Sequence, residues 1–126
     1  MIKITIDGKP TPKKAVKQGR YNAYNSQKSF MDGLRWRIKE QYKGKLLTGG
    51  VSINVTYFMP IPKSTPKKEL PELFWHIKRP DTDNLTKMIK DCMSGIVYKD
   101  DSQVCDSHYK KIYSDNPRTV INIEEL

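Results

Sequence analysis

The chain has 126 residues, enough for one compact domain with a modest hydrophobic core but not for a second domain. No segment approaches the roughly 18 consecutive apolar residues of a membrane-spanning helix. The amino terminus lacks the apolar run of a secretory signal. We therefore expect a single domain over residues 1–126, cytoplasmic and without a membrane partner.

Positive charge is concentrated in the first part of the chain. Residues 1–80 hold 17 Lys and Arg against 5 Asp and Glu, whereas residues 81–126 hold 6 against 9. The two parts have net charges of +12 and −3, which together give the overall +9. This division favours a polyanionic partner for the first part and a cation site in the second. A basic surface that only aids solubility is the alternative.

The first 24 residues predict a strand and a loop. Isoleucine alternates with polar residues over residues 2–6, the period of a half-buried strand. Prolines, glycines and five cations at about residues 8–24 predict an exposed loop. The loop either grips a phosphate backbone or is simply solvated.

A helix is predicted next, with Ser26 as its cap. Its apolar positions Phe30, Leu34 and Ile38 recur every fourth residue, and it ends before Gly44.

The second half predicts a strand, a long loop, a helix and two strands. Alternation predicts a strand over residues 51–59, and prolines predict an exposed loop over residues 60–80. Apolar residues at helical spacing over residues 85–93 predict the most regular helix, followed by strands at about 103–113 and 119–123. The order β-α-β-α-β-β predicts an α+β (or α/β two-layer) fold, a small mixed sheet with about two packed helices.

Two aromatic residues, Phe74 and Trp75, lie near Lys78 in the long loop. Exposed aromatics among cations can stack on unpaired bases or wedge a branch point. Burial against the core is equally consistent with the sequence.

Two carboxylates, Asp81 and Asp83, lie immediately before the second helix. Extended backbone would point both side chains to the same side, and hard oxygen donors of this kind suit Mg²⁺, with Mn²⁺ as a substitute. The alternative is that one of the two acids only caps the helix.

Lys87 shares a helix face with Asp83 and Asp91, because the three are spaced by four residues. Beside a metal site, the Lys87 ammonium could stabilise charge that develops on a phosphate oxygen. An ordinary salt-bridge ladder is the alternative, and for Asp91 we favour that structural role.

A second acidic pair, Asp100 and Asp101, follows the helix. Adjacent residues point in different directions on an extended chain, so one acid is expected to join the metal and the other to support it or to contact solvent. A turn is the alternative. The helix is about 18 Å long, so one metal site requires this pair to fold back beside Asp81 and Asp83.

These motifs resemble the RusA family of Holliday junction resolvases, which are small dimeric Mg²⁺-dependent endonucleases. The resemblance runs over two segments, Lys78-Arg79-Pro80-Asp81-Thr82-Asp83-Asn84-Leu85-Thr86-Lys87, continuing to Asp91, and Tyr98-Lys99-Asp100-Asp101-Ser102-Gln103-Val104. It implies metal-binding catalytic roles for Asp81, Asp83 and Asp101, with Asp100 as an auxiliary acid. Lys87 matches a lysine that is important for cleavage.

The implied function is paired, symmetric cleavage of a four-way DNA junction by a homodimer, with Mg²⁺ activating water and no organic cofactor. The cations expected to contact DNA are Lys13, Lys14, Lys17, Arg20, Lys78 and Arg79. Two alternatives stay open: a noncatalytic module that binds branched DNA, and a metal-dependent nuclease that acts on flaps or RNA.

Overall fold

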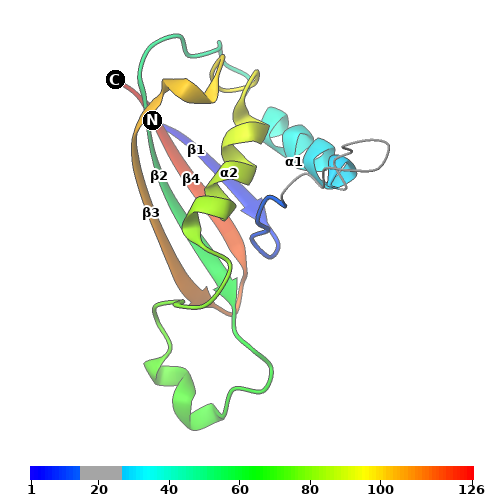
Figure 1. Ribbon diagram of the computed structural model, residues 1–126, viewed down its shortest axis with the longest axis vertical. Coiled ribbons are helices and arrows are strands. Elements are labelled where there is room, and N and C mark those ends of the chain that lie inside the picture. Colours follow the sequence, from blue (N-terminus) through cyan, green and yellow to red (C-terminus); the bar gives the residue numbers. More distant parts are fainter. Residues whose placement is uncertain (15–26) are drawn as a thin grey trace.

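Four strands form one sheet, and two α-helices cover one of its faces (Figure 1). The computed structural model describes residues 1–14 and 27–126. The elements in chain order are β1 (Ile2–Asp7), α1 (Lys28–Gln41), β2 (Val51–Pro60), the 3₁₀-helix η1 (Lys67–Glu72), α2 (Thr82–Met93), the 3₁₀-helix η2 (Asp101–Gln103), β3 (Val104–Ser114) and β4 (Arg118–Glu125). The predicted mixed α+β architecture and its element order are confirmed.

The sheet has the strand order β1-β4-β2-β3. β4 pairs antiparallel with both β1 and β2, whereas β2 and β3 are parallel. Parallel neighbours need a crossover connection, and α2 lies within that connection. The helix therefore runs back across the sheet, from the carboxyl ends of β2 and β3 towards their amino ends.

The core lies between the sheet and the two helices. Register aligns Ile4 of β1 with Ile121 of β4 and Ile121 with Val55 of β2, so fully buried side chains form a row across three strands. Onto this face α2 packs its apolar stripe, Leu85, Met88, Ile89, Cys92 and Met93, all buried. The alternating apolar residues of the strands and the apolar stripe of α2 thus pack together in a single core.

The buried stripe of α1 differs from the predicted one. Met31, Leu34 and Ile38 are buried, whereas Phe30 is 45% exposed. Spacings of three and four residues keep the stripe on one face, and a residue one position earlier is rotated about 100° away from it. The predicted cap Ser26 lies outside the described residues.

The predicted loop at 60–80 contains more structure than expected. Residues 67–72 form η1, and Trp75 makes an antiparallel bridge with Ile112 on the outer edge of β3. In the other predicted loop, residues 8–14 form no helix or strand, and residues 15–24 lie outside the described part of the chain. Across the described segments, no helix has the length and apolar character needed to cross a membrane.

A buried hydrogen bond joins the sheet to α2. The hydroxyls of Tyr57 and Thr86 lie 2.6 Å apart, and burial raises the pKa of Tyr57. We expect Tyr57→Phe or Thr86→Val alone to lower the free energy of unfolding by about 1–3 kcal/mol, because each leaves one buried hydroxyl without a partner.

The double variant should cost less than the sum of the two single variants, because no buried hydroxyl remains unpaired. Urea denaturation of the four proteins measures this coupling. Strict additivity would contradict the role given to the hydrogen bond.

Candidate active site

Asp81 and Asp83 lie at the amino terminus of α2, beside the carboxyl end of β3. Asp81 occupies the position before the helix with extended backbone, and the helix begins at Thr82. Asp83 is therefore helical, so the predicted extended backbone over Asp81–Asp83 is wrong. The alternative role of a capping acid is not observed either, because neither acid makes a side-chain cap hydrogen bond to α2.

Both carboxylates are exposed, and among the described residues neither accepts a hydrogen bond or forms an ion pair. The positive end of the helix dipole stabilises negative charge at this place. Mg²⁺ is commonly held by one or two carboxylates and several waters. The pair Asp81 and Asp83 therefore fits the oxygen ligands that Mg²⁺ prefers.

Lys111 of β3 supports the segment that precedes Asp81. Its Nζ donates to the carbonyl oxygens of Lys78 at 2.6 Å and Pro80 at 2.7 Å. Desolvation lowers the pKa of Lys111, and the nearby Asp81 charge opposes that shift. Sequence reasoning missed this residue. The sequence did contain a hint of this role. Lys111 alternates with Tyr109 and Tyr113 along the strand, so it lies on the same face of β3 as these two aromatic residues.

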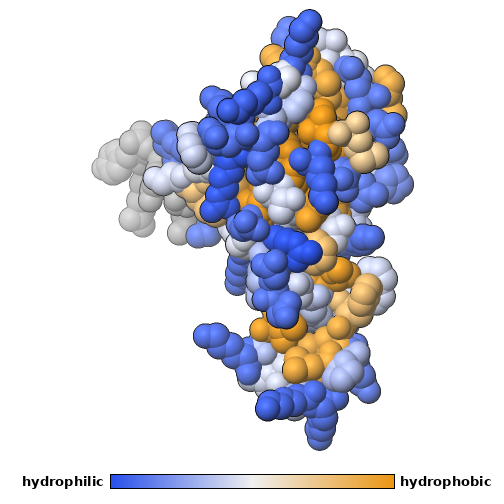
Figure 2. Space-filling model, turned by 180° about the vertical axis from the view of Figure 1, so that it is seen from behind, coloured by the Kyte–Doolittle hydropathy of each residue, from blue (hydrophilic) through white to orange (hydrophobic). Residues whose placement is uncertain are grey.

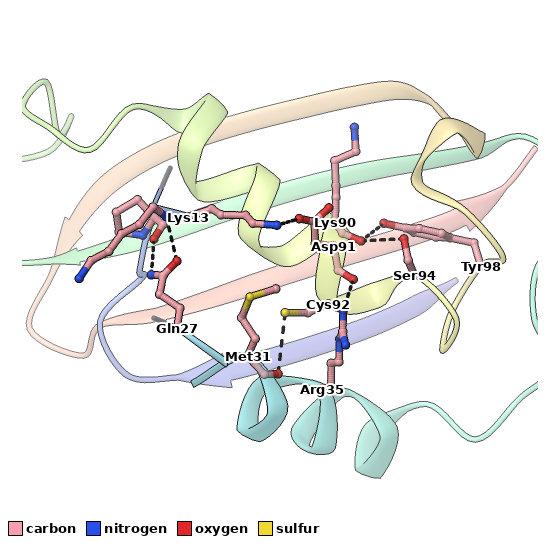
Figure 3. A network of polar contacts seen from close by, with 11 residues as sticks. Lys13, Gln27, Met31, Arg35, Lys90, Asp91, Cys92, Ser94 and Tyr98 are labelled. Atoms are coloured by element: carbon pink, nitrogen blue, oxygen red, sulfur yellow. Dashed lines mark hydrogen bonds and ion pairs between the residues drawn. The ribbon is translucent and has the colours of Figure 1, made fainter. Parts of the chain in front are cut away.

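Lys87 lies one turn after Asp83 and is exposed. Within residues 1–14 and 27–126 it forms no ion pair, so the alternative salt-bridge ladder is not formed. Asp91 instead accepts from Lys13, and Arg35 donates to the Asp91 carbonyl (Figure 3). Asp91 thus has a structural role, as we favoured, but its partner is Lys13 rather than Lys87. The Lys87 ammonium remains available to a ligand.

The six cations expected to contact DNA differ in whether an acidic side chain already neutralises them. Lys13 is compensated by Asp91, and its backbone N–H donates to the Asn84 carbonyl, so it ties the amino-terminal loop to α2. Lys14, Lys78 and Arg79 are exposed and have no acidic partner in the described segments. Lys17 and Arg20 lie outside those segments. DNA contact stays a prediction for each cation.

The second acidic pair divides between two roles. The Asp100 carboxylate accepts from the Ser102 N–H at 3.0 Å and from the Ser102 hydroxyl, and these hydrogen bonds lower its pKa. Gln103 completes this turn by accepting from the Asp100 N–H at 2.9 Å. The Asp101 side chain has no hydrogen bond in the described residues. Asp100 therefore shapes the turn, and Asp101 is free to bind a ligand.

The two acidic pairs lie at opposite ends of α2. The hydroxyl of Tyr98, two residues before Asp100, donates to the Lys90 carbonyl, which holds the turn near the carboxyl end of the helix (Figure 3). α2 has 12 residues and is about 18 Å long. No three His, Cys, Asp or Glu side chains of the described residues come close enough to hold one metal ion. The prediction of one metal site required Asp101 to fold back beside Asp81 and Asp83. Within one chain it does not.

His76 lies where the long loop joins β3. Its ring packs against Tyr113 with centroids 5.0 Å apart, and its backbone N–H donates to the Lys111 carbonyl. Burial, followed by the charge of Lys111, lowers the pKa of His76. Protonation of the His76 imidazole is therefore disfavoured.

Removal of the Lys111 ammonium tests its supporting role. We expect Lys111→Met to lower the free energy of unfolding by about 1 kcal/mol and to speed amide exchange in residues 78–84, because two carbonyls lose their donor. The control is Lys110→Met, since Lys110 is exposed and makes no side-chain hydrogen bond in the described residues. Equal effects of the two substitutions would contradict this role.

Comparison with known proteins extends the local motifs to the whole chain. The family model described as Endodeoxyribonuclease RusA matches residues 5–124. The chain is also 34% identical over 137 residues to the Uncharacterized protein YqaN of Bacillus subtilis (strain 168), an alignment that covers 99% of this chain and 96% of that protein. The chain therefore belongs to the RusA family of endodeoxyribonucleases.

Proposed function

We propose that the protein is a Mg²⁺-dependent endonuclease that resolves four-way DNA junctions by paired, symmetric cleavage. The observation that carries this proposal is the group of unpaired charges at the start of α2. There Asp81 and Asp83 offer free carboxylates, and Lys87 offers a free ammonium one turn away. Membership of an endodeoxyribonuclease family gives this group a phosphodiester to act on.

Each side chain has a distinct task in this proposal. Asp81 and Asp83 bind the metal, which when bound supplies an activated water and neutralises phosphate charge. Lys87 donates to the phosphate oxygen on which negative charge develops. Lys111 keeps the Asp81 backbone in place, so the ligand geometry is set before substrate binds.

The position of Asp101 supports a homodimer with shared sites. In a two-fold dimer whose α2 helices run antiparallel, the free carboxylate at the end of one helix approaches Asp81 and Asp83 at the start of the other. The partner subunit's Asp101 then completes each ligand set. A C₂ dimer gives two equivalent sites, which suits two related nicks in a junction of approximate two-fold symmetry.

The activity is tested with a labelled four-way junction incubated with and without Mg²⁺. We expect symmetric nicks only with the metal, and a loss of at least about 100-fold in Asp81→Asn, because one ligand loses its charge. Glu124→Gln is the matched control, since Glu124 is an exposed acid on the opposite face of the sheet.

Three outcomes would overturn the proposal. Tight junction binding without cleavage under any divalent metal would indicate a noncatalytic binding module. Equal cleavage of a linear duplex of the same sequence would remove the selectivity for junctions. Preferred cleavage of flaps or RNA would indicate a nuclease with another substrate.

The shared site is tested by mixing two inactive variants. Asp81→Asn and Asp101→Asn protomers form heterodimers in which one shared site carries both substitutions and the other carries neither. We expect the mixture to recover nicking, up to about half of the wild-type sites per heterodimer, whereas each variant alone stays inactive. If each site were formed within a single chain, the mixture would recover no activity. A nicking assay on the refolded mixture therefore distinguishes shared sites from single-chain sites.

A further inference from the structure

A lobe of residues 61–79 projects beyond the end of the sheet between β2 and α2 (Figure 1). Hydrophobic side chains gather on its surface (Figure 2). Phe74 is 55% exposed, Trp75 60% and Ile77 88%. Soluble proteins rarely group large apolar side chains in this way unless the patch binds something.

The aromatic pair in this lobe is held in a fixed arrangement. Phe74 and Trp75 meet edge to face, with ring centroids 4.9 Å apart and planes at 84°. Their backbone is bonded to β3, because the Tyr113 N–H donates to the Phe74 carbonyl at 2.8 Å. Ordering this pair on binding therefore costs little conformational entropy.

The charge around the pair suits a polyanion. Residues 61–79 contain five cations and two acids, a net charge of +3. The five cations are Lys63, Lys67, Lys68, Lys78 and Arg79, all exposed. None of them pairs with an acid in the described part of the chain.

The lobe is physically coupled to the proposed cleavage site through Lys111. The carbonyl of Lys111 accepts from the His76 N–H, next to Trp75, while its Nζ donates to the carbonyls of Lys78 and Pro80. One residue of β3 thus fixes both the base of the aromatic pair and the segment that leads to Asp81.

We propose that Phe74 and Trp75 form a stacking platform for unpaired DNA bases, with the lobe cations binding the flanking phosphates. Aromatic faces bind bases of any identity, and cations beside them follow the backbone. The inference rests on the proposed function for its substrate class. It names the feature of the branched DNA that the lobe binds, which is the unpaired bases exposed at a distorted branch point.

Trp75 can report on stacking directly. The chain has two tryptophans, so Trp36→Phe leaves Trp75 as the single one. Without divalent metal, we expect a 16-nucleotide single strand and a four-way junction to quench Trp75 fluorescence. A blunt duplex of the same sequence should quench it much less, because its bases remain stacked.

Substitutions test what the platform contributes to affinity. We expect Trp75→Ala and Phe74→Ala each to weaken single-strand binding by roughly 10-fold or more, while Trp75→Phe keeps most of the affinity. Trp36→Ala is the matched control, because Trp36 is 64% exposed on α1, away from the lobe. Duplex affinity should stay within about two-fold in all four variants, since phosphate contacts dominate it.

Two results would overturn the platform. Equal losses for single strand and duplex would mean that the aromatic pair only shapes the lobe. Conversion to monomers by Trp75→Ala, measured by sedimentation, would mean that a second copy of the chain covers the patch.

The binding assays contain no divalent metal, so their outcome does not depend on cleavage. Quenching by single strands in a protein that cuts no junction would sink the proposed function and leave the platform standing. Normal junction cleavage, with no quenching and no loss of affinity in the variants, would overturn the platform and leave the proposed function intact.

Discussion

The parallel pairing of β2 with β3 is the constraint on which the arrangement of the site depends. Two parallel neighbours force the connecting helix to run back across the sheet, so α2 starts at the carboxyl ends of both strands. Asp81 and Asp83 precede or open that helix and therefore lie at this edge. The turn with Asp100 and Asp101 precedes β3 and therefore lies at the opposite edge.

The same edge brings together residues that are distant in the chain. Lys111 comes near the end of β3, and its ammonium reaches the carbonyls just before Asp81. Ligand sites in open sheets commonly lie outside the carboxyl ends of parallel strands, where the loops converge. Here the loop between β2 and α2 carries the basic, aromatic lobe and ends at Asp81, and Asp83 follows in the first turn of α2. The proposed metal ligands and the proposed DNA-binding lobe are therefore close together in the chain.

Burial and charge have separate places in the structure. α2 places its apolar stripe on the sheet and leaves Asp83 and Lys87 exposed to solvent. The other acid of that helix face, Asp91, is neutralised by Lys13. Asp100 is likewise used by its own turn. At the two ends of α2, the carboxylates without a partner among the described residues are then Asp81 and Asp83 at its start and Asp101 beyond its end. In the proposed dimer, the start of one α2 helix and the end of the other together supply these three carboxylates to one site.

Much of this protein is determined by the sequence alone, because periodicity and turn residues act locally. Strand and helix order, the core face of α2 and the acids at its start all follow from side-chain spacing. The family resemblance also rests on short contiguous motifs. One local detail differed: Met31 rather than Phe30 joins the stripe of α1, since residues one apart on a helix point about 100° apart.

Tertiary structure alone decided which of these elements meet. Strand direction depends on long-range pairing, so the sequence could not tell that Asp101 lies a helix length from Asp81. For the same reason it could not show that Lys111 supports the Asp81 segment or that Asp91 pairs with Lys13. The sequence also could not decide whether Phe74 and Trp75 are exposed, because an aromatic pair in a loop can pack in a core or lie on a surface. Their exposure follows from the pairing of this loop with the edge strand β3.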